Sequence, residues 1–154
     1  MNWQLVIYPI SAILSIALAD GVAPLVLFDE APIGKGWSPF NFLNNNEIIS
    51  QGYYSNSTTD LLVRLADLEC PGDRFTVLID GWQTLNSSIV DFNDCATYTN
   101  DENVAFFGRG WSRLSFLLPA GFRKIEIAVL TSPLDGGTAS IRFDQNYFTR
   151  WAYD

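Results

Sequence analysis

Histidine is absent from the 154-residue sequence, and cysteine occurs only twice, at Cys70 and Cys95. Without histidine neither a Ser-His-Asp nor a Cys-His catalytic site can be assembled, which excludes most hydrolase mechanisms. Two cysteines alone also cannot complete a tetrahedral zinc site. We therefore expect no cofactor and no enzymatic activity.

Basic side chains are scarce as well. Nine Lys and Arg residues stand against seventeen Asp and Glu residues, a formal net charge of -8. A protein with this field repels phosphate backbones and anionic membranes, so nucleic acid is not an expected partner. The closing segment DQNYFTRWAYD lacks the apolar tail of a lipid-anchored precursor, so we expect no membrane anchor.

Charged side chains are missing from the first nineteen residues, MNWQLVIYPISAILSIALA. A short apolar run ending in Ala17-Leu18-Ala19 is typical of a secretory signal peptide, whereas a membrane-spanning helix needs about 20 apolar residues. The sequence predicts a signal peptide over 1–19 and a single secreted, extracellular domain over 20–154. An uncleaved anchor is the alternative.

In an oxidising compartment the two cysteines are expected to pair, and a Cys70–Cys95 disulfide would stabilise the fold by about 3 kcal/mol. Asn56-Ser57-Thr58 and Asn86-Ser87-Ser88 are N-glycosylation sequons, and both lie in segments that look like turns. If the host is eukaryotic, we expect a glycoprotein modified at Asn56 or Asn86.

Period-two alternation of apolar residues dominates the sequence after residue 60, and long helical patterns are missing. We expect core strands around Leu61–Leu65, Phe75–Ile79, Leu114–Leu118, Ile125–Val129 and Ala139–Phe143, and two further strands over 22–28 and 47–53. Turn signals such as PGD, DG, PAG and PLDGG separate them. The pattern predicts an all-β protein, an antiparallel β-sandwich of jelly-roll or immunoglobulin-like kind with one disulfide.

Asp80-Gly81 is a turn signal at the end of one of these strands. Both residues suit the two positive-φ positions of a type I′ hairpin, whose return strand would begin at Trp82. We favour this structural role over a ligand contact by Asp80.

Carboxylates are the remaining candidates for catalysis, because two of them can hydrolyse a glycosidic bond. The candidates are Asp67, Glu69, Asp73 and Glu126, but their spacing does not bring any two of them together. Three of them lie at a strand end and a turn, where solvated acids are normal, and Glu126 lies on an exposed face. The sequence favours solvated surface carboxylates.

The acidic loop over 90–103 carries hard oxygen ligands of the kind that Ca²⁺ takes, although its spacing is not that of an EF-hand. We favour an ordinary surface loop over a metal site. The calcium candidates are Asp91, Asn93, Asp94, Asp101 and Glu102.

Aromatic residues are in excess, with five Trp, six Tyr and eleven Phe. Trp37, Trp82 and Trp111 lie in turn-rich segments, where an exposed indole can stack on a sugar ring. The same side chains can instead fill a core or a protein interface, which is the more common role.

The segments GDRFTVLIDG (72–81), FFGRGWSRLSFLLPAGFRKIEIAV (106–129) and SPLDGGTASIRFD (132–144) resemble a group of small secreted fungal proteins. That group carries a G-D-x-F-x-V-x-x-N/D-G strand and hairpin, and the resemblance implies no known activity. We expect a non-catalytic protein of the fungal cell surface or host interface, acting on an extracellular protein or polysaccharide. A carbohydrate-binding module or lectin is the alternative, and a glycoside-type enzyme a weaker one.

Overall fold

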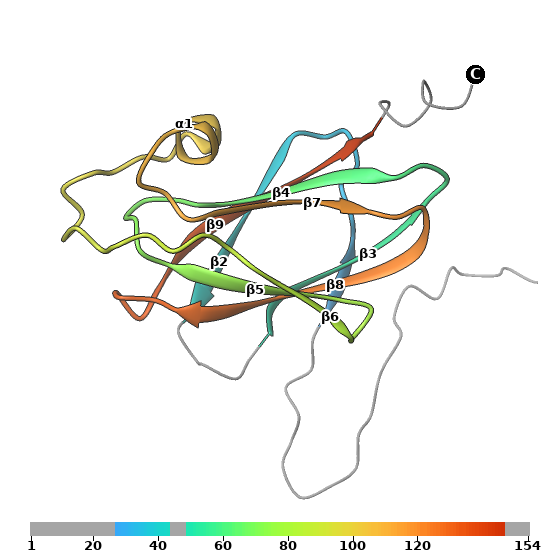
Figure 1. Ribbon diagram of the computed structural model, residues 1–154, viewed down its shortest axis with the longest axis horizontal. Coiled ribbons are helices and arrows are strands. Elements are labelled where there is room, and N and C mark those ends of the chain that lie inside the picture. Colours follow the sequence, from blue (N-terminus) through green and yellow to red (C-terminus); the bar gives the residue numbers. More distant parts are fainter. Residues whose placement is uncertain (1–26, 44–48, 147–154) are drawn as a thin grey trace, which may run out of the picture.

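The computed structural model describes residues 27–43 and 49–146, so the predicted signal peptide and the C-terminal aromatic segment lie outside the described residues (Figure 1). Most of the described chain is strand. The elements are β1 (Phe28–Glu30), β2 (Trp37–Leu43), β3 (Ile49–Ser57), β4 (Leu61–Asp67), β5 (Arg74–Ile79), β6 (Gln83–Asn86), α1 (Glu102–Phe107), β7 (Arg113–Leu118), β8 (Gly121–Thr131) and β9 (Gly136–Gln145).

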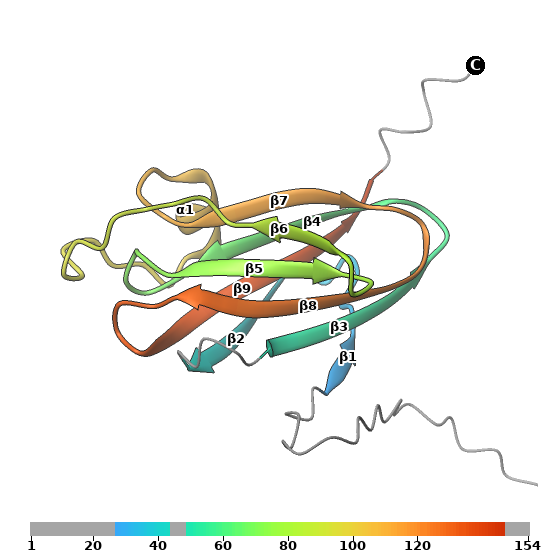
Figure 2. The ribbon, with the colours of Figure 1, turned by 60° about the horizontal axis from the view of Figure 1, so that its bottom comes forward.

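The strands form two packed sheets, which Figures 1 and 2 show as two layers. Sheet A has the order β1-β3-β8-β5-β6, and sheet B has the order β2-β9-β4-β7. The antiparallel pairs β2–β9, β3–β8, β4–β7 and β5–β6 are nested one inside the next. Eight strands folded over as nested pairs make a jelly roll. The predicted β-sandwich is confirmed, and its jelly-roll form is the one observed.

The core lies between the two sheets, and it is formed by the apolar residues that the period-two alternation predicted to be buried. Phe75, Val77 and Ile79 of β5 are at most 2% exposed, while Arg74 and Thr76 point the other way and are half-buried. The remaining predicted strands behave alike. Buried residues of β4, β8 and β9 in the same cluster are Leu61, Val63, Leu65, Ile125, Ile127, Val129, Ala139, Ile141 and Phe143.

A second, smaller apolar cluster lies on the outer side of sheet B. It joins Ala66 and Leu68 to Ala105 and Phe106 of α1 and to Trp111, so the helix covers one end of this sheet (Figure 1). The helix begins after Asp101, whose carboxylate accepts hydrogen bonds from the first-turn N–H groups of Asn103 and Val104. The sequence did not predict this helix.

The Asp80-Gly81 hairpin is confirmed. The two residues have φ of 52° and 78°, and the Trp82 N–H donates to the Ile79 carbonyl at 3.2 Å. The return strand β6 begins at Gln83, one residue later than predicted. Asp80 has a structural task, since its carboxylate accepts from the Lys124 N–H at 2.8 Å and pairs with Arg123 at 2.9 Å.

The disulfide between Cys70 and Cys95 is formed, with Cα atoms 4.8 Å apart. It connects the turn after β4 to the acidic loop before α1. The neighbouring residues Glu69 and Thr99 add an antiparallel bridge with backbone hydrogen bonds of 2.7 and 3.2 Å. Across the described residues, no helix is long and apolar enough to span a membrane.

Other details of the prediction are wrong. Strand β2, with Pro39 inside it, is not among the predicted strands. Asn56 and Asn86 are exposed but lie in strands β3 and β6 rather than in turns. The strand expected over 47–53 is β3 and continues to Ser57, whereas most of the strand expected over 22–28 lies outside the described residues.

Candidate functional site

The outer face of sheet B carries a row of aromatic and polar side chains that crosses all four strands. Strand register pairs Trp37 of β2 with Arg142 of β9, Arg142 with Arg64 of β4, and Arg64 with Ser115 of β7. Residues paired in this way on one face lie side by side. We call Trp37, Arg142, Arg64 and Ser115 the outer-face row.

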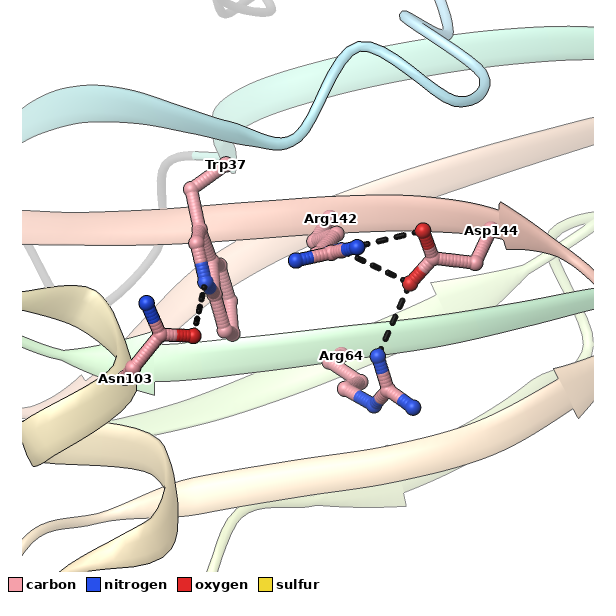
Figure 3. Close-up of polar contacts among 5 residues, drawn as sticks. All are labelled: Trp37, Arg64, Asn103, Arg142 and Asp144. Carbon is pink, nitrogen blue, oxygen red and sulfur yellow. Dashed lines mark hydrogen bonds and ion pairs between the residues drawn. The ribbon is translucent and has the colours of Figure 1, made fainter.

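Asp144 holds the two arginines of the row together (Figure 3). The Arg142 Nε donates to both carboxylate oxygens, at 3.0 and 2.8 Å, and the Arg64 Nη1 donates to Oδ2 at 2.8 Å. The three side chains are 33%, 24% and 23% exposed for Arg142, Arg64 and Asp144, so solvent and a ligand can reach them. Two guanidinium groups share one carboxylate, which leaves one uncompensated positive charge.

This arrangement is poorly suited to stability alone. Arg64 and Arg142 are directly opposite each other on neighbouring strands, and like charges in such a pair destabilise a sheet. Asp144 offsets part of the repulsion between them. Residues that break a local stability rule often mark a functional site, so the pair is the first candidate here.

Trp37 closes one end of the outer-face row. Its indole Nε1 donates to the Asn103 side-chain oxygen at 3.1 Å, and its ring lies 5.6 Å from that of Phe106. The Arg64 guanidinium also lies 5.8 Å from the centre of the Phe106 ring. Helix α1 therefore fixes the indole and one guanidinium, while Trp37 stays half-buried.

A small open hollow adjoins the row. It has a volume of about 350 Å³, within the usual range for ligand pockets, and its lining includes Asp144 and Gln145 of β9 with Ile33 and Gly34 of the β1–β2 connection. Asp144 lines the hollow and also binds Arg64 and Arg142, so the hollow and the two arginines are neighbours on one surface.

The second notable cluster is a buried pair of acids, Asp67 and Asp73. They are 0% and 5% exposed, so the prediction that they are solvated surface carboxylates is wrong. Asp67 Oδ2 accepts the N–H groups of Gly72 and Asp73 at 3.2 Å each. The turn after β4 folds back and takes both acids out of water.

Burial, the nearby Asp73 charge and the hydrogen bond between the two side chains raise the pKa of Asp67 to about 9. Burial also raises the pKa of Asp73, against a hydrogen bond from Ser132 that lowers it. With its pKa raised to about 9, Asp67 keeps its proton at neutral pH, so the pair does not have to carry two buried negative charges. The pair is enclosed and cannot reach a polymer substrate.

The three predicted stacking residues do not form one site. Trp111 is only 3% exposed and packs in the cluster under α1, which is the core role that the sequence favoured over stacking. Trp82 is 75% exposed, but it lies at the hairpin tip of sheet A. Trp37 is the tryptophan placed beside other candidate binding groups.

The acidic loop does not gather its oxygen ligands. Asp101 caps α1, and the Asn93 side-chain amide donates to the Thr97 hydroxyl at 3.1 Å. Asp91, Asp94 and Glu102 join no acidic cluster, because the described part of the chain contains no group of three or more Cys, Asp or Glu residues that could hold a metal.

The sequence analysis predicted neither the buried acid pair nor the arginine cluster, although the apolar alternation shows which side of each strand these residues face. Asp67 continues the inward parity of Leu61, Val63 and Leu65, and Asp73 continues that of Phe75 and Val77. Arg64, Arg142 and Asp144 occupy outward positions of two predicted strands, which identifies their face but not their neighbours.

Comparison with known proteins gives a similarity in structure but none in sequence family. No protein-family model and no curated protein matches the chain. Among solved structures, the pre-peptidase C-terminal domain of a collagenase from Bacillus anthracis is similar, with 6% sequence identity and a TM-score of 0.48, over 78% of this chain and 97% of that chain. A similarity at this level assigns the protein to no family and gives it no function.

Proposed function

We propose that the protein is a secreted, non-catalytic domain that binds a glycan through the outer face of sheet B. One observation carries this proposal: register places an indole, two guanidinium groups and a hydroxyl in one row across four strands. Aromatic faces stack on sugar rings, while polar groups beside them bind hydroxyls and set orientation. A sheet face presents such a row as a flat platform for an extended polymer.

Secretion is supported by three features that belong together. The leading apolar segment resembles a signal peptide, the single disulfide Cys70–Cys95 is formed, and both sequon asparagines, Asn56 and Asn86, are exposed. The resemblance to small secreted fungal proteins supports a place at the fungal cell surface or host interface.

A non-catalytic role is supported by the placement of the acids. Glycoside hydrolysis needs two carboxyl groups on either side of the bound sugar. Among the described residues, the carboxylate in contact with the arginines of the outer-face row is Asp144, and it is occupied by both of them. Asp67 and Asp73 do form a pair, but they are buried.

A protein partner is the second candidate, and α1 favours it. Val104 and Phe107 on this helix are 52% and 68% exposed, next to the outer-face row. Exposed apolar side chains beside arginine and tryptophan are typical of protein interfaces.

The test is a binding assay on chitin, β-glucan and plant cell-wall polymers with two tryptophan variants. Trp37→Ala should weaken binding by at least about tenfold, because truncating a tryptophan that anchors a ligand costs about 2 kcal/mol or more. Trp82→Ala is the matched control, since Trp82 lies on the other sheet, and it should bind like the wild type.

Thermal unfolding of both variants separates lost binding from lost folding. The proposal would be contradicted if the wild-type protein bound none of the polymers. It would also be contradicted if Trp82→Ala lost binding and Trp37→Ala kept it.

A further inference from the structure

We infer that the glycan bound at the outer-face row carries carboxylate groups, as a polymer of uronic acids does, and that Arg142 and Arg64 bind one of them. This inference rests on the proposed glycan-binding function. It names the class of ligand that the two arginines select.

The outer-face row is locally more basic than the molecule as a whole. Arg64 and Arg142 stand there against one acid in direct contact with them, Asp144. Arg113 also lies at an outward position, but its guanidinium binds the carbonyls of Phe106 and Gly108. Glu69 reaches the same face farther along β9, at Thr138. The complete chain has a formal charge of -8. Two neighbouring arginines that share one carboxylate give an otherwise acidic protein a local site for an anion.

The arginines of the row have donors that Asp144 does not use. Arg142 contacts Asp144 through Nε, and Arg64 contacts it through Nη1. Because a guanidinium has five N–H donors, each keeps donors for a second acceptor. Figure 3 shows the end of the Arg142 guanidinium directed towards Trp37, so an acceptor there would lie beside the indole. Arginine binds carboxylates in two-point contacts, which matches this geometry.

A neutral sugar leaves the repulsion between the two arginines in place. Arg64 and Arg142 are directly opposite, and Asp144 neutralises one of their two charges. A ligand carboxylate would supply the second negative charge and remove the remaining imbalance. Binding energy is therefore gained from an acidic sugar that a neutral one of the same shape does not give.

The negative net charge of the protein does not prevent an acidic ligand from binding at the row, because salt screens the more distant charges. At physiological ionic strength screening acts over about 8 Å, so the rest of the acidic surface contributes little at the row. The arginines therefore act through direct contact and not through long-range steering.

Titration calorimetry with oligomers of polygalacturonic acid and with the same oligomers methyl-esterified tests the inference. The two ligands share a backbone and differ in the carboxylate charge. We expect the acidic oligomers to bind at least about tenfold more tightly, as charge-assisted hydrogen bonds predict. Arg142→Gln should lose this preference, and Arg64→Gln should reduce it.

Arg123→Gln is the matched control, because Arg123 pairs with Asp80 on the other sheet, and it should keep the preference. Arg142→Lys keeps the charge but loses the two-point geometry, so it should reduce the preference several-fold and serves if Arg142→Gln does not fold.

Other results would separate the failure of this inference from the failure of the proposed function. Equal binding of the acidic and esterified oligomers, both weakened by Trp37→Ala, would overturn this inference and leave the proposed function intact. Binding of dextran sulfate but not of polygalacturonate would overturn the assignment to a carboxylate. Binding of neither these ligands nor the neutral polymers would overturn the proposed function as well.

Discussion

Asp67 shows how burial changes the chemistry of a single side chain. Its pKa is raised to about 9, so the folded protein holds a proton that the unfolded chain loses near 4. Between these two values the folded state binds more protons than the unfolded state. The contribution of Asp67 to stability is therefore fully present below about pH 4 and is lost as the pH rises through about 9.

The substitution Asp67→Asn should make the free energy of unfolding depend much less on pH. An asparagine oxygen can still accept the N–H groups of Gly72 and Asp73, and its amide can donate to the Asp73 carboxyl without a titrating proton. We expect the variant to be more stable than the wild type at pH 8, by chemical denaturation. Asp94→Asn, at an exposed position, is the control. A wild-type stability that rises from pH 5 to 8.5 would contradict this account of Asp67.

Asp80 and Gly81 should respond differently to substitution. Asp80→Asn keeps the bond from the Lys124 N–H and loses only the partly exposed ion pair with Arg123, so the free energy of unfolding should fall by less than about 1 kcal/mol. Gly81→Val forces a β-branched residue to φ of 78° and should lower it by about 1–3 kcal/mol.

Urea denaturation of the two variants measures the difference. If Asp80→Asn abolished ligand binding while stability stayed the same, the hairpin would be the binding site and the outer-face row would not.

The strands and turns that could be predicted from the sequence are those whose structure is determined by residues close together in the chain. Strand β5 and its hairpin follow from alternation and from Asp80-Gly81, which act within a few residues. Strand β2 was missed because Pro39 and the nearby glycines read as a loop. Since β2 is an edge strand of sheet B, a residue without an N–H is tolerated there.

Helix α1 and the outer-face row were missed for different reasons. Six residues are too few for a helical period to be recognised, and the Asp101 cap is the main local signal. The row joins Trp37, Arg64 and Arg142 from three strands far apart in the sequence. Alternation gives the face of each residue, whereas register between distant strands depends on the whole fold.

For the molecule as a whole, the jelly roll leaves most contacts non-local, so the single cross-link matters. The Cys70–Cys95 disulfide spans 25 residues and holds the acidic loop against the end of β4. Its reduction should lower the free energy of unfolding by about 3 kcal/mol on the chain-entropy account.

Thermal unfolding with and without reductant checks this prediction, and Cys70→Ser/Cys95→Ser should match the reduced protein. An unchanged melting temperature after complete reduction would contradict it.

The central claim is that a glycan binds on the outer face of sheet B. Chemical-shift mapping of the folded protein, titrated with polygalacturonic acid oligomers, locates the contact directly. We predict that the largest changes fall on the Trp37 indole, on Arg64 and Arg142, and on the amides of β9 and β4 around them. Changes centred on Trp82 and the β5–β6 hairpin, with the outer face of sheet B unaffected, would contradict the account.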